Sequence, residues 1–266
     1  MRKLIIIFMF LAVNVWFALG WTPPSPITPP NIVPDAIANM NVGIISGSVP
    51  VAGGGGDPAC SGYLVCQNFE GEGYDNSESP AETGAGVNED YTTDALRGSQ
   101  SLLITANAVT DDGLKWTISS QSGTIGAFLR VKIPTGETHG DDYRFFVLYN
   151  DTTVLAYFKI TSSRTIAGYH GTTYISPTGS PTLSENTTYY IWVDYTPSSG
   201  SDDGTLGYYV SETTTKPGSA NKATTEGTNT TSADGFGIYS VHDSSPGDYI
   251  FDQIYVDDAV IGNVSS

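Results

Sequence analysis

The sequence predicts an all-β protein whose main part is a two-sheet antiparallel β-sandwich. Three observations predict this fold class. From about Asp57 onward, Thr, Ser, Gly and Tyr dominate the composition. Apolar and polar residues alternate over short runs, and clusters of Gly, Asn, Asp and Ser separate those runs. No helical periodicity lasts beyond a turn or two, so we expect strands joined by turns.

The first 20 residues read as a secretory signal peptide. Arg2 and Lys3 form a basic start, residues 4–13 are an apolar run, and residues 18–20 offer small residues suited to cleavage. The alternative is a membrane anchor, but the apolar run is short and no stop-transfer pattern follows. We expect a secreted or surface protein, extracellular or periplasmic, with no membrane span after cleavage.

Residues 21–57 read as a Pro/Gly-rich linker, and residues 58–266 as one β-sandwich domain. The linker either holds the domain away from a surface or is a leader without a role. The net charge of the whole chain is −17, and loss of the signal peptide would remove two further positive charges. So acidic a chain is a poor candidate for binding nucleic acid through bulk charge.

The two cysteines, Cys60 and Cys66, suit one small-loop disulfide in an exported protein. The alternative is a pair of free thiols in a reducing compartment. Two cysteines cannot complete a tetrahedral zinc site, and only His139, His170 and His242 are present to help. All three histidines lie near expected turns, where a solvated side chain is the common case.

We expect about a dozen strands, with loops at residues 71–94 and 213–235. The expected strands are 63–70, 101–105, 114–118, 127–133, 144–149, 154–160, 165–169, 172–175, 187–195, 206–210, 236–241 and 249–262. Successive side chains of a strand face opposite ways. In the strand 127–133 this alternation turns Ala127, Leu129, Val131 and Ile133 inward, and in 154–160 it does the same for Val154, Ala156, Phe158 and Ile160.

The expected last strand, 249–262, pairs in this interpretation with the first, 63–70, to close the sandwich. Its even positions would share one face, and they are Ile250, Asp252, Ile254, Val256, Asp258 and Val260. A carboxylate such as that of Asp252 is costly on a mostly apolar face unless it is paired or bound to a metal. Strand 63–70 also ends in a carboxylate, that of Glu70.

Several short motifs follow one another in an order typical of a known fold family. They are Asn68-Phe-Glu-Gly71, Leu96-Arg-Gly-Ser-Gln-Ser-Leu-Leu-Ile104, Tyr190-Ile-Trp-Val-Asp-Tyr195 with its Asp-Gly turn, and Phe251-Asp-Gln-Ile-Tyr-Val256. Over residues 60–262 the chain resembles the concanavalin A-like jelly rolls, including laminin-G-like domains, and β-sandwich carbohydrate-binding modules. The resemblance implies a jelly-roll β-sandwich. That family includes lectins, glucanases, lyases and adhesion domains, so the fold alone does not decide the function.

The resemblance also implies a structural calcium ion. An acidic residue of the first strand and an Asp of the last hold such an ion in many of these sandwiches, which points to Glu70 and Asp252 with backbone carbonyl oxygens completing the site. The alternative is that Asp252 caps a turn or pairs with Arg97.

A glycan-binding face is the second candidate site. Tyr157, Tyr190 and Trp192 project to the polar sides of their strands, and sugars stack on such rings. Five of the 11 Lys and Arg residues lie between residues 130 and 164. Four of these, Arg130, Lys132, Arg144 and Lys159, complete the candidate face for a polysaccharide that would be anionic. The alternative is that the basic residues decorate any exposed sheet and the rings fill a second core.

No catalytic residue is assigned. The paired-Glu motif of the glucanases of this fold is absent, as is the Gln-x-His motif of its lyases. Tyr157-Phe-Lys159 is similar to a lyase strand only over those residues. We therefore expect a non-catalytic, lectin-like module. The alternatives are a lyase acting on an anionic glycan and a structural or adhesion domain of a viral or cell-surface appendage.

Overall fold

A computed structural model describes residues 62–70, 74, 80–105, 112–136, 142–227, 229–240 and 247–264. The expected signal peptide, the linker and Cys60 lie outside these residues. The described residues belong to one compact unit, Ser48–Ser266.

The described residues form fifteen strands. They are β1 (Val65–Gln67), β2 (Ala81–Thr83), β3 (Val87–Tyr91), β4 (Ser101–Thr105), β5 (Asp112–Gln121), β6 (Ile125–Lys132), β7 (Tyr143–Asn150), β8 (Thr153–Ile160), β9 (Ile166–His170), β10 (Thr173–Ile175), β11 (Thr188–Thr196), β12 (Gly204–Ser211), β13 (Lys222–Glu226), β14 (Ala233–Ser240) and β15 (Asp248–Asp257). Within this described part there is no helix long and apolar enough to cross a membrane.

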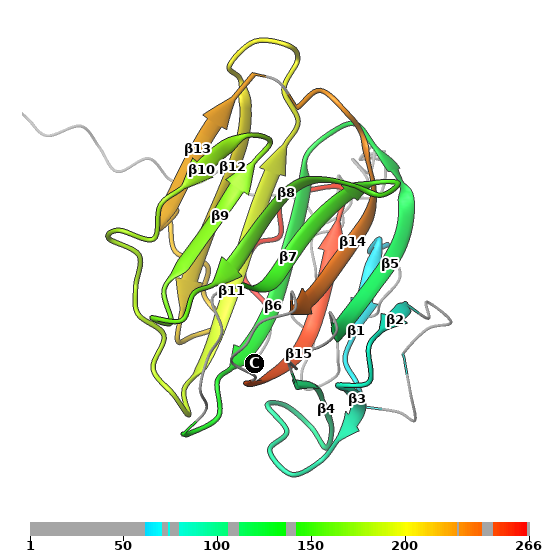
Figure 1. Ribbon diagram of the computed structural model, residues 1–266, viewed down its shortest axis with the longest axis vertical. Coiled ribbons are helices and arrows are strands. Elements are labelled where there is room, and N and C mark those ends of the chain that lie inside the picture. Colours follow the sequence, from blue (N-terminus) through cyan, green and yellow to red (C-terminus); the bar gives the residue numbers. More distant parts are fainter. Residues whose placement is uncertain are drawn as a thin grey trace, which may run out of the picture. The chain divides into compact units, whose positions relative to one another are not determined.

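The strands make two antiparallel sheets. Sheet A has the order β13-β12-β11-β6-β15-β4-β3, with β1 also paired to β15, and sheet B has the order β10-β9-β8-β7-β14-β5-β2. Figure 1 shows sheet B in front, with β8, β7, β14 and β5 crossing the view, and sheet A behind it. The expected all-β, concanavalin A-like jelly-roll sandwich is confirmed.

The core between the sheets follows from the alternation along each strand. On β6, Ala127, Leu129 and Val131 point into the main core, where they meet side chains of sheet B such as Phe158. The other face of β6 does not open to solvent at every position. Phe128 is fully buried in a second, smaller apolar cluster on the outer side of sheet A.

Three strands lie in segments that the sequence predicts as loops. β2 and β3 fall within residues 71–94, and β13 falls within 213–235. These strands are polar, with exposed or partly exposed residues over most of their length, and they pair with β5, β4 and β12. Because such edge strands have little apolar alternation, sequence periodicity misses them.

The last strand pairs with the first as predicted, through Val65 opposite Val256. The predicted shared face of the even positions is wrong. The β15–β6 register shifts between Asp252 and Tyr255, and Gln253 adopts a positive φ of 47°. This β-bulge adds one residue and reverses the alternation after it. The main core therefore receives Tyr249 and Phe251 before the bulge, and Ile254 and Val256 after it.

Candidate functional site

The outer face of sheet B carries a ladder of three tyrosines. Tyr157 on β8 lies directly opposite Tyr169 on β9, which lies opposite Tyr174 on β10. Their ring centroids are 5.4 Å apart for Tyr157–Tyr169 and 4.9 Å apart for Tyr169–Tyr174. Tyr174 is 50% exposed. Cross-strand neighbours on one face are held at contact distance by the ladder hydrogen bonds, so the three rings form a continuous aromatic surface.

Arg144 of β7 lies next to this ladder. Its Cζ is 4.2 Å from the centroid of the Tyr157 ring and 5.4 Å from that of Tyr239 on β14. Its Nη1 donates to the Tyr239 hydroxyl over 2.8 Å, and its Nε and Nη2 donate to the two Asp142 oxygens over 2.9 Å each. The guanidinium is therefore fixed in place by three directed hydrogen bonds.

These contacts set the protonation states of the face. Burial alone would lower the pKa of Arg144, but its hydrogen bonds to Asp142 and the nearby phenols raise that pKa above its ordinary value. Burial raises the pKa of Tyr157 to about 12, although Arg144 acts in the opposite direction. At neutral pH Arg144 is a permanent cation, and the Tyr157 hydroxyl keeps its proton and can donate it in a hydrogen bond.

Beyond Arg144 the aromatic surface continues across β14 toward β5. The rings of Tyr239 and Tyr149 stack with centroids 6.4 Å apart, and Lys115 Nζ lies 4.3 Å from the centroid of Tyr149. A Cβ on Gly237 would lie 3.0 Å from Cε2 of Tyr149. The absence of a side chain at Gly237 therefore lets the Tyr149 ring lie against the backbone of β14.

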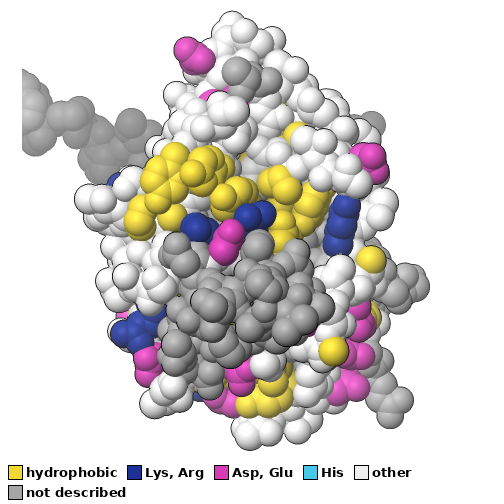
Figure 2. Space-filling view, viewed as in Figure 1, with side chains coloured by type: hydrophobic (Ala, Val, Ile, Leu, Met, Phe, Trp, Pro, Cys, Tyr) yellow, Lys and Arg dark blue, Asp and Glu magenta, His cyan; other side chains and the backbone are white. Residues whose placement is uncertain are grey.

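We call these side chains the tyrosine face. Its members are Tyr149, Tyr157, Tyr169, Tyr174 and Tyr239 with Lys115, Arg144, Lys159 and Asp142. The strands that bear it run β10-β9-β8-β7-β14-β5, a width of about 24 Å at the usual strand spacing. Figure 2 shows a hydrophobic band across this side of the molecule, interrupted by blue cationic and magenta acidic side chains.

The tyrosine face has a different charge from the chain as a whole. Around Arg144 it carries two cations, Arg144 and Lys159, and one carboxylate, that of Asp142, whereas the chain has a net charge of −17. At its other end Lys115 donates to the carbonyl oxygen of Asp151, whose N–H donates to the Asp234 carboxylate. Asp142 serves both Arg144 and Lys159, whose Nζ lies 3.9 Å from it. Such a local excess of positive charge favours anionic ligands over short distances, because solvent ions screen the more distant carboxylates.

The predicted glycan face is divided between the two sheets. Tyr157, Arg144 and Lys159 lie on the outer side of sheet B, on β7 and β8. The remaining four predicted residues lie on the outer side of sheet A, on β6 and β11, and are Arg130, Lys132, Tyr190 and Trp192. The chain changes sheets between β6 and β7, so basic residues close in sequence are separated by the whole sandwich.

Trp192 is not available to a ligand, which corrects its predicted role. It is fully buried in the outer cluster of sheet A with Phe128 and Tyr255, and its Nε1 donates to the carbonyl oxygen of Gly262 over 2.8 Å. The C-terminal segment covers it, with Ile261 in the same cluster. This is the second core that the sequence left open as an alternative.

The other sheet A candidates also have structural partners. The ring of Tyr190 stacks on Phe128 with centroids 6.4 Å apart, and Arg130 lies over Tyr190 at 5.0 Å. Lys132 forms an ion pair with Asp94 at 2.7 Å. These contacts stabilise the outer side of sheet A, where the partly buried rings of Tyr63 and Tyr190 stack on the buried rings of Tyr255 and Phe128.

Sequence reasoning missed six members of the tyrosine face, and they are Lys115, Asp142, Tyr149, Tyr169, Tyr174 and Tyr239. A signal was present for two of them. Tyr169 and Tyr174 occupy neighbouring short strands joined by a tight turn, and equal distances from that turn place them on one face. The positions of Tyr149 and Tyr239 follow from the β7–β14 pairing, which is not visible in the sequence.

The two carboxylates predicted to hold calcium approach the same loop. Asp252 is fully buried; its Oδ1 accepts from the Gln253 N–H at 2.7 Å and its Oδ2 from the Ser101 hydroxyl at 3.3 Å. Oε2 of the exposed Glu70 accepts from the N–H and the hydroxyl of Ser99 at 3.0 and 3.2 Å. Burial raises the pKa of Asp252 to about 7, and the backbone N–H of Gln253 and the charge of Arg130 oppose that rise.

This donor set fits a hard cation only with help from the backbone. Within the described ranges, no group of three or more His, Cys, Asp or Glu side chains could hold a metal ion. Calcium accepts carbonyl and hydroxyl oxygens beside carboxylates, so Glu70, Asp252 and backbone oxygens remain a chemically suitable combination. The proposed alternative, capping, is also present, because a backbone hydrogen bond joins Arg97 to Asp252.

One cysteine and one histidine, Cys66 and His170, lie among the described residues, and both are buried. Cys66 is buried in β1, and its predicted bond to Cys60 stays a prediction, since Cys60 lies outside the described residues. His139 and His242 also lie outside them. The expectation of a solvated side chain is wrong for His170, which is fully buried between the sheets.

Comparison with known proteins agrees with the fold. The chain is similar to a structure described as cellulose induced protein, Cip1, with 13% identity over 75% of this chain and 100% of that chain, at a TM-score of 0.54. It is also similar to a Trypanosoma rangeli sialidase, with 12% identity over 77% of this chain and 32% of that chain, at a TM-score of 0.53. The chain thus spans about a third of the sialidase. No protein-family model and no curated protein sequence matches the chain.

Proposed function

We propose that this protein binds a polysaccharide through the tyrosine face and does not catalyse a reaction on it. The observation that carries the proposal is the aromatic surface itself. Four partly exposed tyrosines lie on one side of sheet B with cations between them, and the buried Tyr149 lies beside them. Sugar rings present apolar C–H faces to aromatic rings, and their hydroxyl groups need fixed donors and acceptors beside those rings. The tyrosine face supplies both.

The ligand that this face suits best is an anionic glycan. Arg144 and Lys159 share the single carboxylate of Asp142, and a carboxylate or sulfate on the glycan would find an oriented guanidinium in Arg144. Two of the solved structures with a similar fold have names tied to carbohydrates, those of the sialidase and the cellulose induced protein, which supports a glycan as the ligand class.

A second candidate function is elimination on a uronate polymer. Arg144 would neutralise the uronate carboxylate, and the Tyr239 hydroxyl, which accepts from Nη1 of Arg144 over 2.8 Å, would exchange a proton with the sugar. A base would remove the proton α to the carboxylate, the glycosidic oxygen would leave with a proton from an acid, and a C=C bond would form. The binding function is favoured because elimination needs a base, and burial raises the pKa of Tyr157 to about 12, which keeps that phenol protonated at neutral pH.

We place this function outside the cell, where residues 1–20 would direct the chain. Residues 21–57 would then hold the domain away from its point of attachment. Calcium held by Glu70 and Asp252 would be structural, since both lie on the β1, β4 and β15 side of the sandwich and the tyrosine face lies on sheet B.

Affinity electrophoresis with a panel of polysaccharides tests the proposal. Neutral glucans, alginate, polygalacturonate and a sulfated glycan would each be cast into native gels. We expect retardation by at least one anionic polymer, weakened by added salt, with no gain in ultraviolet absorbance. An absorbance gain with a uronate polymer would establish the lyase instead. Unaltered migration in every gel would contradict both and leave the adhesion domain.

A further inference from the structure

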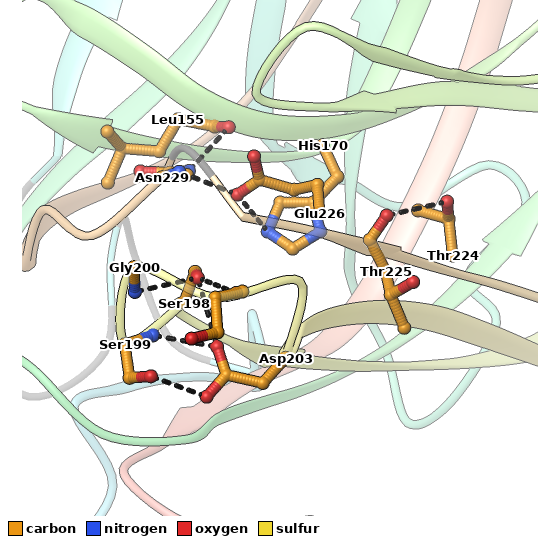
Figure 3. A network of polar contacts seen from close by, with 11 residues as sticks. Leu155, His170, Ser198, Ser199, Gly200, Asp203, Thr224, Thr225, Glu226 and Asn229 are labelled. Carbon is orange, nitrogen blue, oxygen red and sulfur yellow. Dashed lines mark hydrogen bonds and ion pairs between the residues drawn. The ribbon is translucent and has the colours of Figure 1, made fainter.

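A small polar cluster is buried between the two sheets, behind the β9–β10 end of the tyrosine face. It consists of His170 at the end of β9, Tyr195 in β11 and Glu226 at the end of β13, none more than 4% exposed. Nε2 of His170 lies 3.3 Å from Oε1 of Glu226, and the rings of His170 and Tyr195 meet edge to face with centroids 5.4 Å apart. Figure 3 shows the imidazole directed at Glu226.

The cluster is under-satisfied for its depth. Among the described residues, no group forms a well-aligned hydrogen bond with either ring nitrogen of His170 or with the hydroxyl of Tyr195. The contact of the imidazole with Glu226 is therefore an electrostatic one, whose strength depends on the charge of His170.

The cluster also joins the sheets at one edge of the sandwich. His170 belongs to sheet B, Tyr195 and Glu226 belong to sheet A, and β10 and β13 are the edge strands. Asn229 extends the connection, since its N–H donates to Glu226 Oε1 over 2.8 Å and its Nδ2 donates to the carbonyl oxygen of Leu155 on β8 over 2.9 Å. Figure 3 shows this chain of contacts from Leu155 through Asn229 to Glu226.

Protonation of His170 would place a positive charge in this buried cluster. Burial lowers the pKa of His170, and the charge of Glu226 acts in the opposite direction. Among the described residues, three uncharged ones lie next to the imidazole: Tyr195, whose pKa is raised first by burial and then by Glu226, and the strand neighbours Ala156 and Thr173. A protonated His170 would therefore be a cation in the core with one carboxylate near it.

The direction of the pH effect follows from that lowered pKa. An unfolded chain binds the His170 proton below about pH 6.5, whereas the folded protein binds it only at lower pH. The contribution of neutral His170 to stability is therefore complete above about pH 6.5. It is lost as the pH falls toward the folded-state pKa.

We propose that His170 and Glu226 form a proton-sensitive latch that holds β9 and β10 against sheet A, and that protonation of His170 loosens both strands. Neighbouring residues of β9 face opposite ways, so Tyr169 on the tyrosine face shares its strand with His170 in the core. If both strands loosened, the rings of Tyr169 and Tyr174 would no longer be held beside the ring of Tyr157. The latch would thereby release a bound glycan at acid pH, a consequence that rests on the proposed function, whereas the loosening itself does not.

Hydrogen exchange of the glycan-free protein tests the latch directly. Amide protection over residues 166–175, corrected for intrinsic rates, should fall at least about tenfold between about pH 7.5 and about pH 5, while β6 and β7 stay protected. His170→Gln and His170→Phe cannot be protonated and should remove this pH dependence. His139→Gln and His242→Gln are the controls and should keep it. Glu226→Gln should move the midpoint to lower pH.

The outcomes separate the latch from the glycan site. Amide protection over residues 166–175 that does not depend on pH would overturn the latch. A pH dependence that persists in both His170 variants would also overturn it, as would a loss of amide protection over all strands at the same pH. An NMR titration of the His170 ring that gives a pKa above 6.5 would also overturn it. A working latch with no retardation by any polysaccharide would overturn only the proposed function. Retardation by alginate that is lost at acid pH in wild type but kept in His170→Phe would support both.

Discussion

Asp252 is the residue whose charge the fold controls most closely. It is fully buried, and burial raises the pKa of its carboxyl to about 7. Because the folded state then binds a proton that the unfolded state has already lost, the metal-free protein should lose stability as the pH rises from about 4 to about 7. The loss should be at most about 4 kcal/mol for a shift of this size. Thermal unfolding in a chelator at several pH values measures it.

Calcium should reverse that trend at Asp252. Added Ca²⁺ would favour the carboxylate, so the Tm at about pH 8 should rise with calcium in wild type and stay unchanged in Asp252→Asn. The Asn variant should also lose the pH dependence in chelator. Asp258→Asn, an exposed change on the same chain segment, is the matched control. An equal calcium response in wild type and Asp252→Asn would rule out this site.

Trp192 shows how burial separates a structural role from a binding role. Its indole is fully enclosed and donates to the Gly262 carbonyl oxygen, so Trp192→Ala should cost about 3–5 kcal/mol of stability through the cavity it creates. Chemical denaturation measures this cost. A Trp192→Ala variant that unfolds at the wild-type midpoint but no longer binds glycan would contradict the placement of this residue.

The bulge at Gln253 sets the register of β15. Inserting one alanine after Gln253 would move the second half of the strand by one further position, so Ile254 and Val256 would turn away from the core. We expect the insertion variant to be unfolded or aggregated by circular dichroism and size-exclusion chromatography. Gln253→Gly keeps the residue count and the positive φ, and should fold with a Tm at or above that of wild type. An insertion variant with a wild-type Tm would contradict this account of the bulge.

Particular strands show what the sequence could and could not predict. The β6 alternation was readable because Ala127, Leu129 and Val131 are apolar and their neighbours Arg130 and Lys132 are not. The phase of β15 was not readable, since a single extra residue reverses it without altering composition. The polar edge strands β2, β3 and β13 are held by backbone pairing and carry no apolar signal.

The candidate site was predictable only in part, and for a reason of topology. Arg144, Tyr157 and Lys159 lie on consecutive strands of one sheet, so local alternation identifies them. Arg130 and Lys132 precede the change of sheet, and nothing in their sequence context marks it. Tyr239 joins Arg144 from a strand more than ninety residues later, through a hydrogen bond between residues 95 positions apart. Pairings at such separation come from the packed structure.

At the scale of the whole domain, the two outer sides of the sandwich differ in what covers them. The outer side of sheet A is closed by the C-terminal segment over Trp192, whereas sheet B presents its aromatic surface across about six strands, or about 24 Å. A ligand lying along that width would contact several rings in succession. Affinity should therefore rise with the length of an oligosaccharide and then level off, which calorimetry with size-fractionated fragments would show. Equal affinity for a monosaccharide and a long fragment would contradict an extended site.

The most direct test of the central claim compares the two sides of the sandwich. Calorimetry would use a polysaccharide that slows the protein in affinity electrophoresis. It would be run on two double variants, Tyr169→Ala/Tyr174→Ala in sheet B and Tyr190→Ala/Tyr209→Ala in sheet A. At about 1–2 kcal/mol per lost ring contact, the sheet B pair should weaken binding at least about tenfold with its fold intact, and the sheet A pair should bind as wild type does. Loss of binding in the sheet A pair alone would place the glycan on the opposite side and contradict the account.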